Sequence, residues 1–196
     1  MHPFATNSTE RQHIPFFLAF IAIAAGIVTS WALSVFHIDV PWWAPPLDTM
    51  TFYGLLFWIF DRFIWKWRLI QYLQISRLPV LVGEWHGQVE PAERIARGSA
   101  MQVTVTISQS WLGLSIRGVT SQSRSHSLSA SLLVGDENTL TYEYMNEPLA
   151  NAPATMHAHR GTANLTLQQG GTVLEGEYYS GRDRRSFGTI RLTRLN

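Results

Sequence analysis

An uncharged apolar run near the N-terminus constrains the fold of this chain more than any other feature. From Ile14 to Phe36 the sequence is IPFFLAFIAIAAGIVTSWALSVF, which as a helix would extend roughly 35 Å and cross the hydrocarbon core of a bilayer. A second apolar stretch follows at 47–69, after prolines that indicate a turn. The first run is too long for the apolar core of a cleaved signal peptide. We therefore expect transmembrane helices at 14–36 and 47–69, joined by a short outer loop at 37–46.

Formal charges around these segments predict their orientation. Basic residues, including the only lysine, lie toward the outer ends of the two runs, whereas the connecting loop and the beginning of the second run contain only Asp39 and Asp48 as formal charges. By the positive-inside rule, the tail at 1–13 and the stalk at 70–79 face the cytoplasm. Asp61-Arg62 interrupts the second run, and buried charge is costly in lipid, so we expect this pair near the headgroups or paired within or between subunits. Because two helices cannot enclose a pore, membrane action requires a homo-oligomer or distortion of the bilayer.

The remaining part of the chain, 80–196, alternates apolar and polar residues with a period of two, as half-buried strands do. Short connections rich in Gly, Ser, Asn and Asp predict antiparallel hairpins between neighbouring strands. We expect eight strands, at 80–90, 99–109, 111–118, 123–134, 138–147, 156–168, 172–181 and 186–194. The predicted fold class is a membrane protein with an N-terminal two-helix transmembrane hairpin and an all-β, eight-stranded antiparallel up-and-down barrel in the cytosol.

The alternation within each strand predicts which side chains face the barrel interior. Leu128, Ala130 and Leu132 are expected inside, and Trp85 is expected to plug the end at which the stalk enters. Large inward side chains such as Met101 and Leu165 predict an interior that is already well filled. The opposite rim then collects eight of the ten arginines of the barrel, Arg94, Arg97, Arg117, Arg124, Arg160, Arg182, Arg184 and Arg185.

The same alternation of inward and outward side chains, extended to that rim, predicts that the opening of the barrel is cationic and aromatic. Guanidinium groups bind phosphate in a bidentate manner and aromatic rings stack on bases, so the opening suits a planar ligand that carries phosphate. The candidate ligand-binding residues are Arg124, His126, Tyr142, Tyr144, His157, His159, Tyr178 and Arg182. The alternative explanation is that barrel rims are loops, that loops are polar, and that nearby acidic residues partly offset the charge.

No pattern in the chain indicates catalysis or a metal centre. His157 and His159 lie on one side of a strand, but no acidic residue follows until Glu175 and no histidine follows at all, so we expect no metal site. The serines of 121–131 are interpreted as an outward strand face and a turn, without a nucleophile-base spacing. The chain has no Gly-rich phosphate loop, and the absence of cysteine excludes disulfides and thiolate ligands. We expect neither enzyme activity nor a cofactor.

The order of the segments resembles one known family. Two membrane helices are followed by Leu78-Pro79, by GEWHG at 83–87 and by LEGEYYSGRDRRSFGTIRL at 174–192. This arrangement resembles the two-transmembrane β-barrel effectors of CBASS anti-phage systems, which have a STING-like role. The resemblance implies a bacterial inner-membrane protein whose cytosolic barrel binds a cyclic dinucleotide-type signal made by a partner synthase, without binding DNA or RNA polymers. It also implies oligomerisation, membrane disruption and death of the infected cell.

Two other classes of function remain open at this level. The barrel could be a membrane-tethered, lipocalin-like carrier of a lipid or another apolar ligand, which requires a roomy apolar cup. It could also be a scaffold that docks a protein partner, which requires an exposed apolar patch on the outer wall. The outward residues are mostly Ser, Thr, Gln and charged, so the sequence favours neither over a nucleotide sensor.

Overall fold

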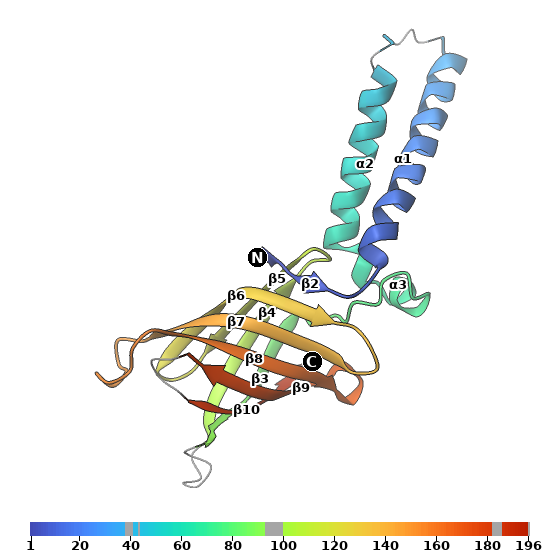
Figure 1. Cartoon of the computed structure of the whole chain (residues 1–196). Coiled ribbons are helices and arrows are strands. Elements are labelled where there is room, and N and C mark those ends of the chain that lie inside the picture. The colour runs from blue at the N-terminus through green and yellow to red at the C-terminus, as the bar shows by residue number, and fades with distance from the viewer. Residues whose placement is uncertain (38–40, 43, 93–99, 182–185, 196) are drawn as a thin grey trace. The chain divides into compact units, whose positions relative to one another are not determined.

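The computed structural model describes residues 1–37, 41–42, 44–92, 100–181 and 186–195. It divides into two compact units. One comprises Ser8–Arg77, and the other comprises Met1–Asn7 together with Leu78–Asn196. The first unit is helical and the second is a β-barrel (Figure 1).

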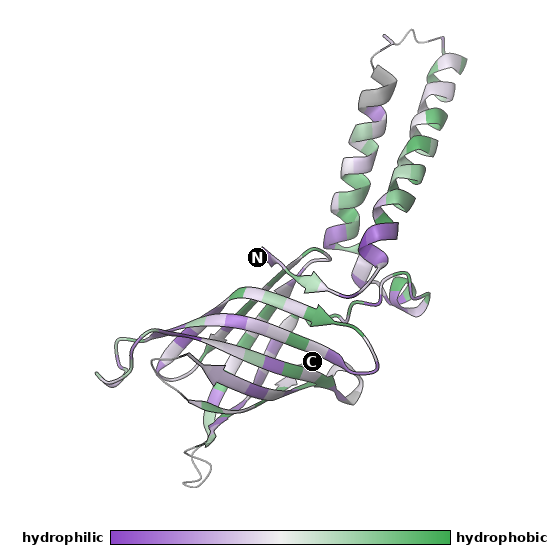
Figure 2. Cartoon of the chain, viewed as in Figure 1, coloured by the Kyte–Doolittle hydropathy of each residue, from purple (hydrophilic) through white to green (hydrophobic). Residues whose placement is uncertain are grey.

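The helical unit is a hairpin of two long helices followed by two short ones. Its elements are α1 (Glu10–Val35), α2 (Ala44–Arg62), the 3-10 helix η1 (Ile64–Lys66) and α3 (Arg68–Tyr72). Among the described helices, α1 is the one that is long and apolar enough to cross a membrane, and green hydrophobic residues recur along it in Figure 2. The apolar stretch expected as one helix at 47–69 is divided between α2, η1 and the beginning of α3.

A stripe of residues holds the helical hairpin together. Ile14, Leu18, Ala22 and Gly26 recur at intervals of four and are the buried apolar positions of α1, as one face of a helix requires. A Cβ atom on Gly26 would lie 2.5 Å from the hydroxyl of Thr49 on α2, so the absence of a side chain permits the close approach of the two helices.

The ends of this unit are joined by one buried carboxylate. Glu10, at the beginning of α1, accepts hydrogen bonds from the Ser76 hydroxyl at 2.9 Å and from the Arg77 amide at 2.7 Å. Such bonds satisfy backbone and side-chain groups that follow α3. The segment expected as a stalk is therefore fixed against the first turn of α1.

The β-barrel has the eight antiparallel strands that the alternation predicts. They are β3 (Gly83–Pro91), β4 (Met101–Gln109), β5 (Gly113–Val119), β6 (Ser123–Leu133), β7 (Asn138–Pro148), β8 (His159–Gln168), β9 (Val173–Ser180) and β10 (Phe187–Arg194). Consecutive strands pair along the chain, β10 pairs with β3, and pairing of β5 with β6 completes the ring. The eight-stranded antiparallel barrel is confirmed.

The N-terminal segment, expected to be a tail, is part of this barrel. Strands β5 and β6 pair only at 117–119 and 124–126. Beyond that point β1 (His2–Pro3) pairs with β5 and β2 (Ala5–Thr6) pairs in parallel with β6. The segment thereby satisfies backbone groups that two separating strands would leave open. The side chain of Asn7 adds hydrogen bonds to both the amide and the carbonyl of Val134, each at 2.8 Å.

The end of the barrel at which β3 begins is filled, and we call it the closed end. Trp85 is completely buried there and donates its indole N–H to the Leu81 carbonyl at 2.9 Å. The Arg194 guanidinium lies 5.5 Å from the indole ring centroid and donates to the carbonyls of Val80 and Val82. The expected plug is confirmed. Large buried side chains complete this end, namely Ile107, Leu114, Ile116, Leu132, Leu140, Leu165, Leu174 and Leu192.

A bulge in β6 reverses the inside and outside of that strand. The register with β7 shifts between Ser127 and Ser129, so one extra residue separates the two halves of the strand. Leu132 is buried on the closed-end side of the bulge, as predicted. On the other side the alternation is shifted by one residue, and Ser123 and Ser127 are the buried positions.

Candidate ligand-binding site

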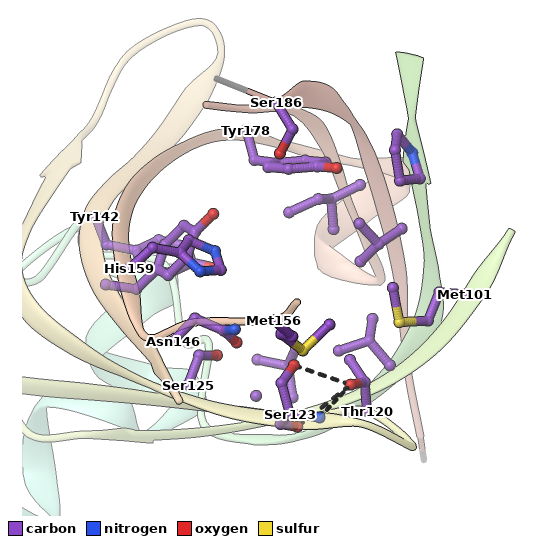
Figure 3. A pocket seen from close by; sticks show the side chains of 17 residues that line it. Met101, Thr120, Ser123, Ser125, Tyr142, Asn146, Met156, His159, Tyr178 and Ser186 are labelled. Carbon is purple, nitrogen blue, oxygen red and sulfur yellow. Dashed lines mark hydrogen bonds between the residues drawn. The ribbon is translucent and has the colours of Figure 1, made fainter. Parts of the chain in front are cut away.

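The other half of the barrel interior contains a cavity, which we call the hollow end. It has a volume of about 330 Å³, within the range of small-molecule sites. Its walls come from all eight strands of the barrel or the loops that adjoin them (Figure 3). The expectation of a well-filled interior is therefore correct for the closed end and wrong for the hollow end.

The cavity exists because small residues occupy inward positions that leucine occupies at the closed end. Gly118 and Ser125 face each other in the β5–β6 register, and a Cβ atom on Gly118 would lie 2.6 Å from the Ser125 hydroxyl. Gly161 is paired with Tyr144, and a Cβ atom there would lie 2.4 Å from the phenol ring. Gly161 thus leaves the space that the Tyr144 ring uses.

Three tyrosines supply aromatic surface to the cavity. Tyr142 and Tyr144 lie on β7 with ring centroids 6.0 Å apart and planes tilted by 51°, and Tyr178 comes from β9. Figure 3 shows the Tyr142 and Tyr178 rings bordering the same open space. Burial raises the pKa of Tyr142 well above its usual range, and Tyr144 raises it further. The Tyr142 phenol is therefore neutral at physiological pH.

Hydroxyl groups order the rim of the hollow end. At the β5–β6 turn, Thr120 accepts from the Ser123 amide at 3.0 Å, and the two hydroxyls lie 3.0 Å apart. Between β9 and β10, the Ser180 hydroxyl accepts from the Ser186 amide at 3.0 Å. These contacts fix the β5–β6 turn and the facing ends of β9 and β10, which border the cavity.

The described residues that line the cavity include no Asp, Glu, Lys or Arg. Their polar groups are hydroxyls, the Asn146 amide and the His159 imidazole. His159 donates from Nδ1 to the His157 carbonyl at 3.0 Å. No group of three or more metal-ligating side chains occurs within the described part of the chain. The arrangement can stack a planar ligand and form neutral hydrogen bonds with its edges.

Comparison with known proteins identifies the family of this chain. Residues 76–194 match the family model described as the Cap15 cyclic dinucleotide receptor domain, and residues 12–66 match the model of the Cap15 transmembrane helices. This chain belongs to the Cap15 family. It is similar to CD-NTase-associated protein 15 of Yersinia aleksiciae, with 28% identity over 91% of this chain and 86% of the relative. The protein of that name from Staphylococcus schleiferi is 26% identical over 92% of this chain and 90% of the relative.

Membership of the Cap15 family confirms the resemblance to CBASS effectors. The two matches cover both units of the molecule, so the chain is a membrane protein with transmembrane helices before a cyclic dinucleotide receptor domain. The receptor-domain match includes every strand from β3 to β10, and it therefore contains the whole wall of the cavity.

The structure brings together half of the ligand-binding residues predicted from the sequence. Tyr142, Tyr144, His159 and Tyr178 line the cavity, whereas Arg182 lies outside the described residues. Three predicted positions need correction, because the side chains of Arg124, His126 and His157 are exposed and do not line it.

The β6 bulge explains two of these corrections. Parity counted from Leu132 places Arg124 and His126 inside, but the extra residue near Ser127 turns both outward. His157 precedes β8, in the loop that leads to it, so strand alternation does not apply to its side chain.

Other residues of the cavity were not predicted, among them Met101 as a site residue, Thr120, Ser123, Ser125, Asn146, Met156 and Ser186. The serines were interpreted as an outward face. A signal was nevertheless present, because Ser123, Ser125 and Ser127 alternate with Arg124 and His126, which is typical of a strand whose small residues face inward.

Proposed function

We propose that the hollow end of the barrel binds a cyclic dinucleotide made by a partner synthase of the CD-NTase class. Binding promotes association of several copies, and the clustered helices disrupt the bacterial inner membrane and kill the infected cell. The proposal rests on family membership and on the chemistry of the cavity. The barrel and both chain termini face the cytoplasm in this proposal, because the basic residues flank the outer ends of the helical hairpin.

The observation that carries the proposal is a cavity whose described lining is uncharged and includes three tyrosines, inside a domain of the receptor family. Aromatic rings that face an enclosed space suit nucleobases, and each base stacked on an aromatic side chain contributes about 1–3 kcal/mol. Hydroxyl and amide groups around the rings supply directed hydrogen bonds. Apolar side chains such as Val103, Val105 and Ile190 also line the cavity, but the polar groups among them distinguish it from the purely apolar cup of a lipid carrier.

Phosphates require positive charge that the described cavity residues do not provide. The sequence carries five arginines in 93–99 and 182–185, namely Arg94, Arg97, Arg182, Arg184 and Arg185. These segments connect β3 to β4 and β9 to β10 and lie outside the described residues. We assign phosphate binding to them on the basis of guanidinium chemistry.

We also infer that the domain acts by binding and not by catalysis. A general base needs a partner that orients it, and His159 donates to a backbone carbonyl and not to a carboxylate. Among the described cavity residues no carboxylate is present that could serve as a second catalytic group. The energy of ligand binding is then available to shift the state of association.

Calorimetric titration of the full chain in detergent micelles tests the binding step. Cyclic di-AMP, cyclic di-GMP and cyclic di-UMP are the probes, and at least one is expected to bind. Tyr178→Ala should weaken that binding about 10-fold to 100-fold, because one stacking surface is lost. Tyr179→Ala is the matched control, since Tyr179 is the next residue of β9 and is 51% exposed.

The output step is tested with the same variants in liposomes that contain a fluorescent dye. Nucleotide should release the dye and increase the oligomer size of wild-type protein, and Tyr178→Ala should need a higher nucleotide concentration. The proposal would be contradicted if none of the three probes bound. The carrier function would be favoured if, in addition, a lipid co-purified with the wild-type protein but not with Tyr178→Ala.

A further inference from the structure

We infer that Asn146 and His159 form a pair that recognises the hydrogen-bonding edge of one nucleobase in the hollow end. This inference rests on the proposed function and extends it by naming which part of the ligand enters the cavity and which side chains select it. The two residues are directly paired across β7 and β8. Each is only 9% exposed, and both line the cavity.

The hydrogen bond of His159 to the backbone determines which of its nitrogens can accept. A carbonyl oxygen has no proton to give, so the 3.0 Å contact with His157 places the proton on Nδ1. In the neutral ring Nε2 is then an acceptor. Within the described part of the molecule Nε2 has no hydrogen-bond partner, and it is not sealed from solvent. His159 therefore offers the cavity an acceptor and no donor.

Asn146 complements that acceptor. Its amide carries both a donor and an acceptor group, and no described residue is bonded to either. Directly opposed side chains on antiparallel strands have Cβ atoms about 4.5–5.5 Å apart, so one base can contact both side chains. Figure 3 shows the two side chains on the same wall of the cavity, with Tyr142 beside them.

The uncharged side chains of the described lining favour a base over a phosphate inside the cavity. No cation is present among the described lining residues, and a buried phosphate without one would lose its hydration without compensation. A nucleobase is neutral and planar, and its buried edge needs hydrogen-bond partners. The pair satisfies a base whose edge presents an N–H group to His159 Nε2 and a second polar group to Asn146. The phosphates remain near the opening.

A cycle of protein and ligand changes tests this contact. The tightest-binding nucleotide of cyclic di-AMP, cyclic di-GMP and cyclic di-UMP is compared with an analogue in which N–CH₃ replaces the N–H groups of the Watson–Crick edge. Calorimetry uses the full chain in micelles, as wild type and as His159→Phe, which keeps a ring but has no acceptor. Each change alone should weaken binding about tenfold or more, because a buried donor or acceptor is left without its partner.

The two changes together should weaken binding little more than either alone, since both remove the same hydrogen bond. His159→Gln, whose side chain retains an acceptor, should recover part of the affinity. His126→Phe is the matched control on the outer surface of β6 and should bind both ligands as wild type does.

The outcomes separate this inference from the proposed function. Independent, multiplicative losses would show that His159 does not contact the methylated edge and would overturn the inference while cyclic dinucleotide binding stands. Equal binding of both ligands to wild type would overturn it in the same way. If the wild-type chain binds none of the three nucleotides, the proposed function itself is contradicted.

Discussion

The two ends of the barrel have the same strands and opposite interiors. At the closed end the inward positions hold Trp85 and a layer of leucines, all close to fully buried. At the hollow end Gly, Ser, Thr and Tyr are interspersed with Val, Met and Ile around a cavity of about 330 Å³. The backbone scaffold is common to both, so the difference comes from side-chain volume. The closed end contributes stability, and the hollow end gives up packing for the cavity in which we propose that the ligand binds.

The largest effect that sharpens this comparison is on the stability of the closed end. Trp85→Ala removes a fully buried ring and its hydrogen bond to Leu81, and should lower the free energy of unfolding by about 3–5 kcal/mol. Urea unfolding of the full chain in micelles, followed by circular dichroism, measures the loss. Tyr178→Ala, which enlarges an existing cavity, should cost clearly less, and equal losses would contradict the division into two ends.

The N-terminal segment that contains β1 and β2 belongs to the closed end, which leads to a second prediction. Phe4 is 4% exposed and lies between β1 and β2, which pair with β5 and β6. Phe4→Ala should lower the free energy of unfolding by about 3 kcal/mol, whereas substitution of the exposed neighbour Ala5→Ser should have little effect. If the Phe4→Ala variant were as stable as the wild-type protein, the segment would be dispensable to the barrel.

Filling the hollow end should also weaken ligand binding. Ser125→Leu places a large side chain in the cavity and should weaken cyclic dinucleotide binding about 100-fold, by occupying the space of the ligand. Arg124→Leu adds a similar group one residue away on the outer surface and should leave the affinity unchanged. Calorimetry of both variants decides the direction of these side chains, and the reverse result would place the bulge of β6 elsewhere.

The smallest effect concerns the ionisation of Tyr142. Burial raises the pKa of its phenol in the folded state, so above the usual tyrosine pKa of about 10 the unfolded chain loses a proton that the folded chain keeps. Its contribution to stability is therefore fully present below about pH 10 and is lost as the pH rises further. Tyr142→Phe should show a shallower alkaline decline in melting temperature than wild type, and identical declines would contradict a buried phenol.

Much of this fold is predictable from the sequence because strand alternation is a local signal. All eight predicted barrel segments overlap the strands observed, and Trp85 was expected at the end that proves to be closed. Tyr142, Tyr144 and Tyr178 followed from the same parity. Family membership could be inferred from the segment order and from the GEWHG and LEGEYYSGRDRRSFGTIRL motifs.

Features that depend on a shift of one residue in strand register were not predictable from the alternation. One extra residue near Ser127 exchanges the inward and outward sets of half a strand, so Arg124 and His126 were placed on the wrong side. Strands β1 and β2 have two residues each, too few for any period to be detected. Their positions depend on the separation of β5 from β6, which is a property of the closed barrel and not of the N-terminal sequence.

The structure of the full chain in complex with its tightest-binding cyclic dinucleotide tests the central claim most directly. One base should lie inside the hollow end, stacked on at least one of Tyr142, Tyr144 and Tyr178, with its edge against Asn146 and His159. The phosphates should lie toward the opening of the cavity. A nucleotide bound on the outer wall beside Arg124 and His126, with the cavity empty, would contradict the account.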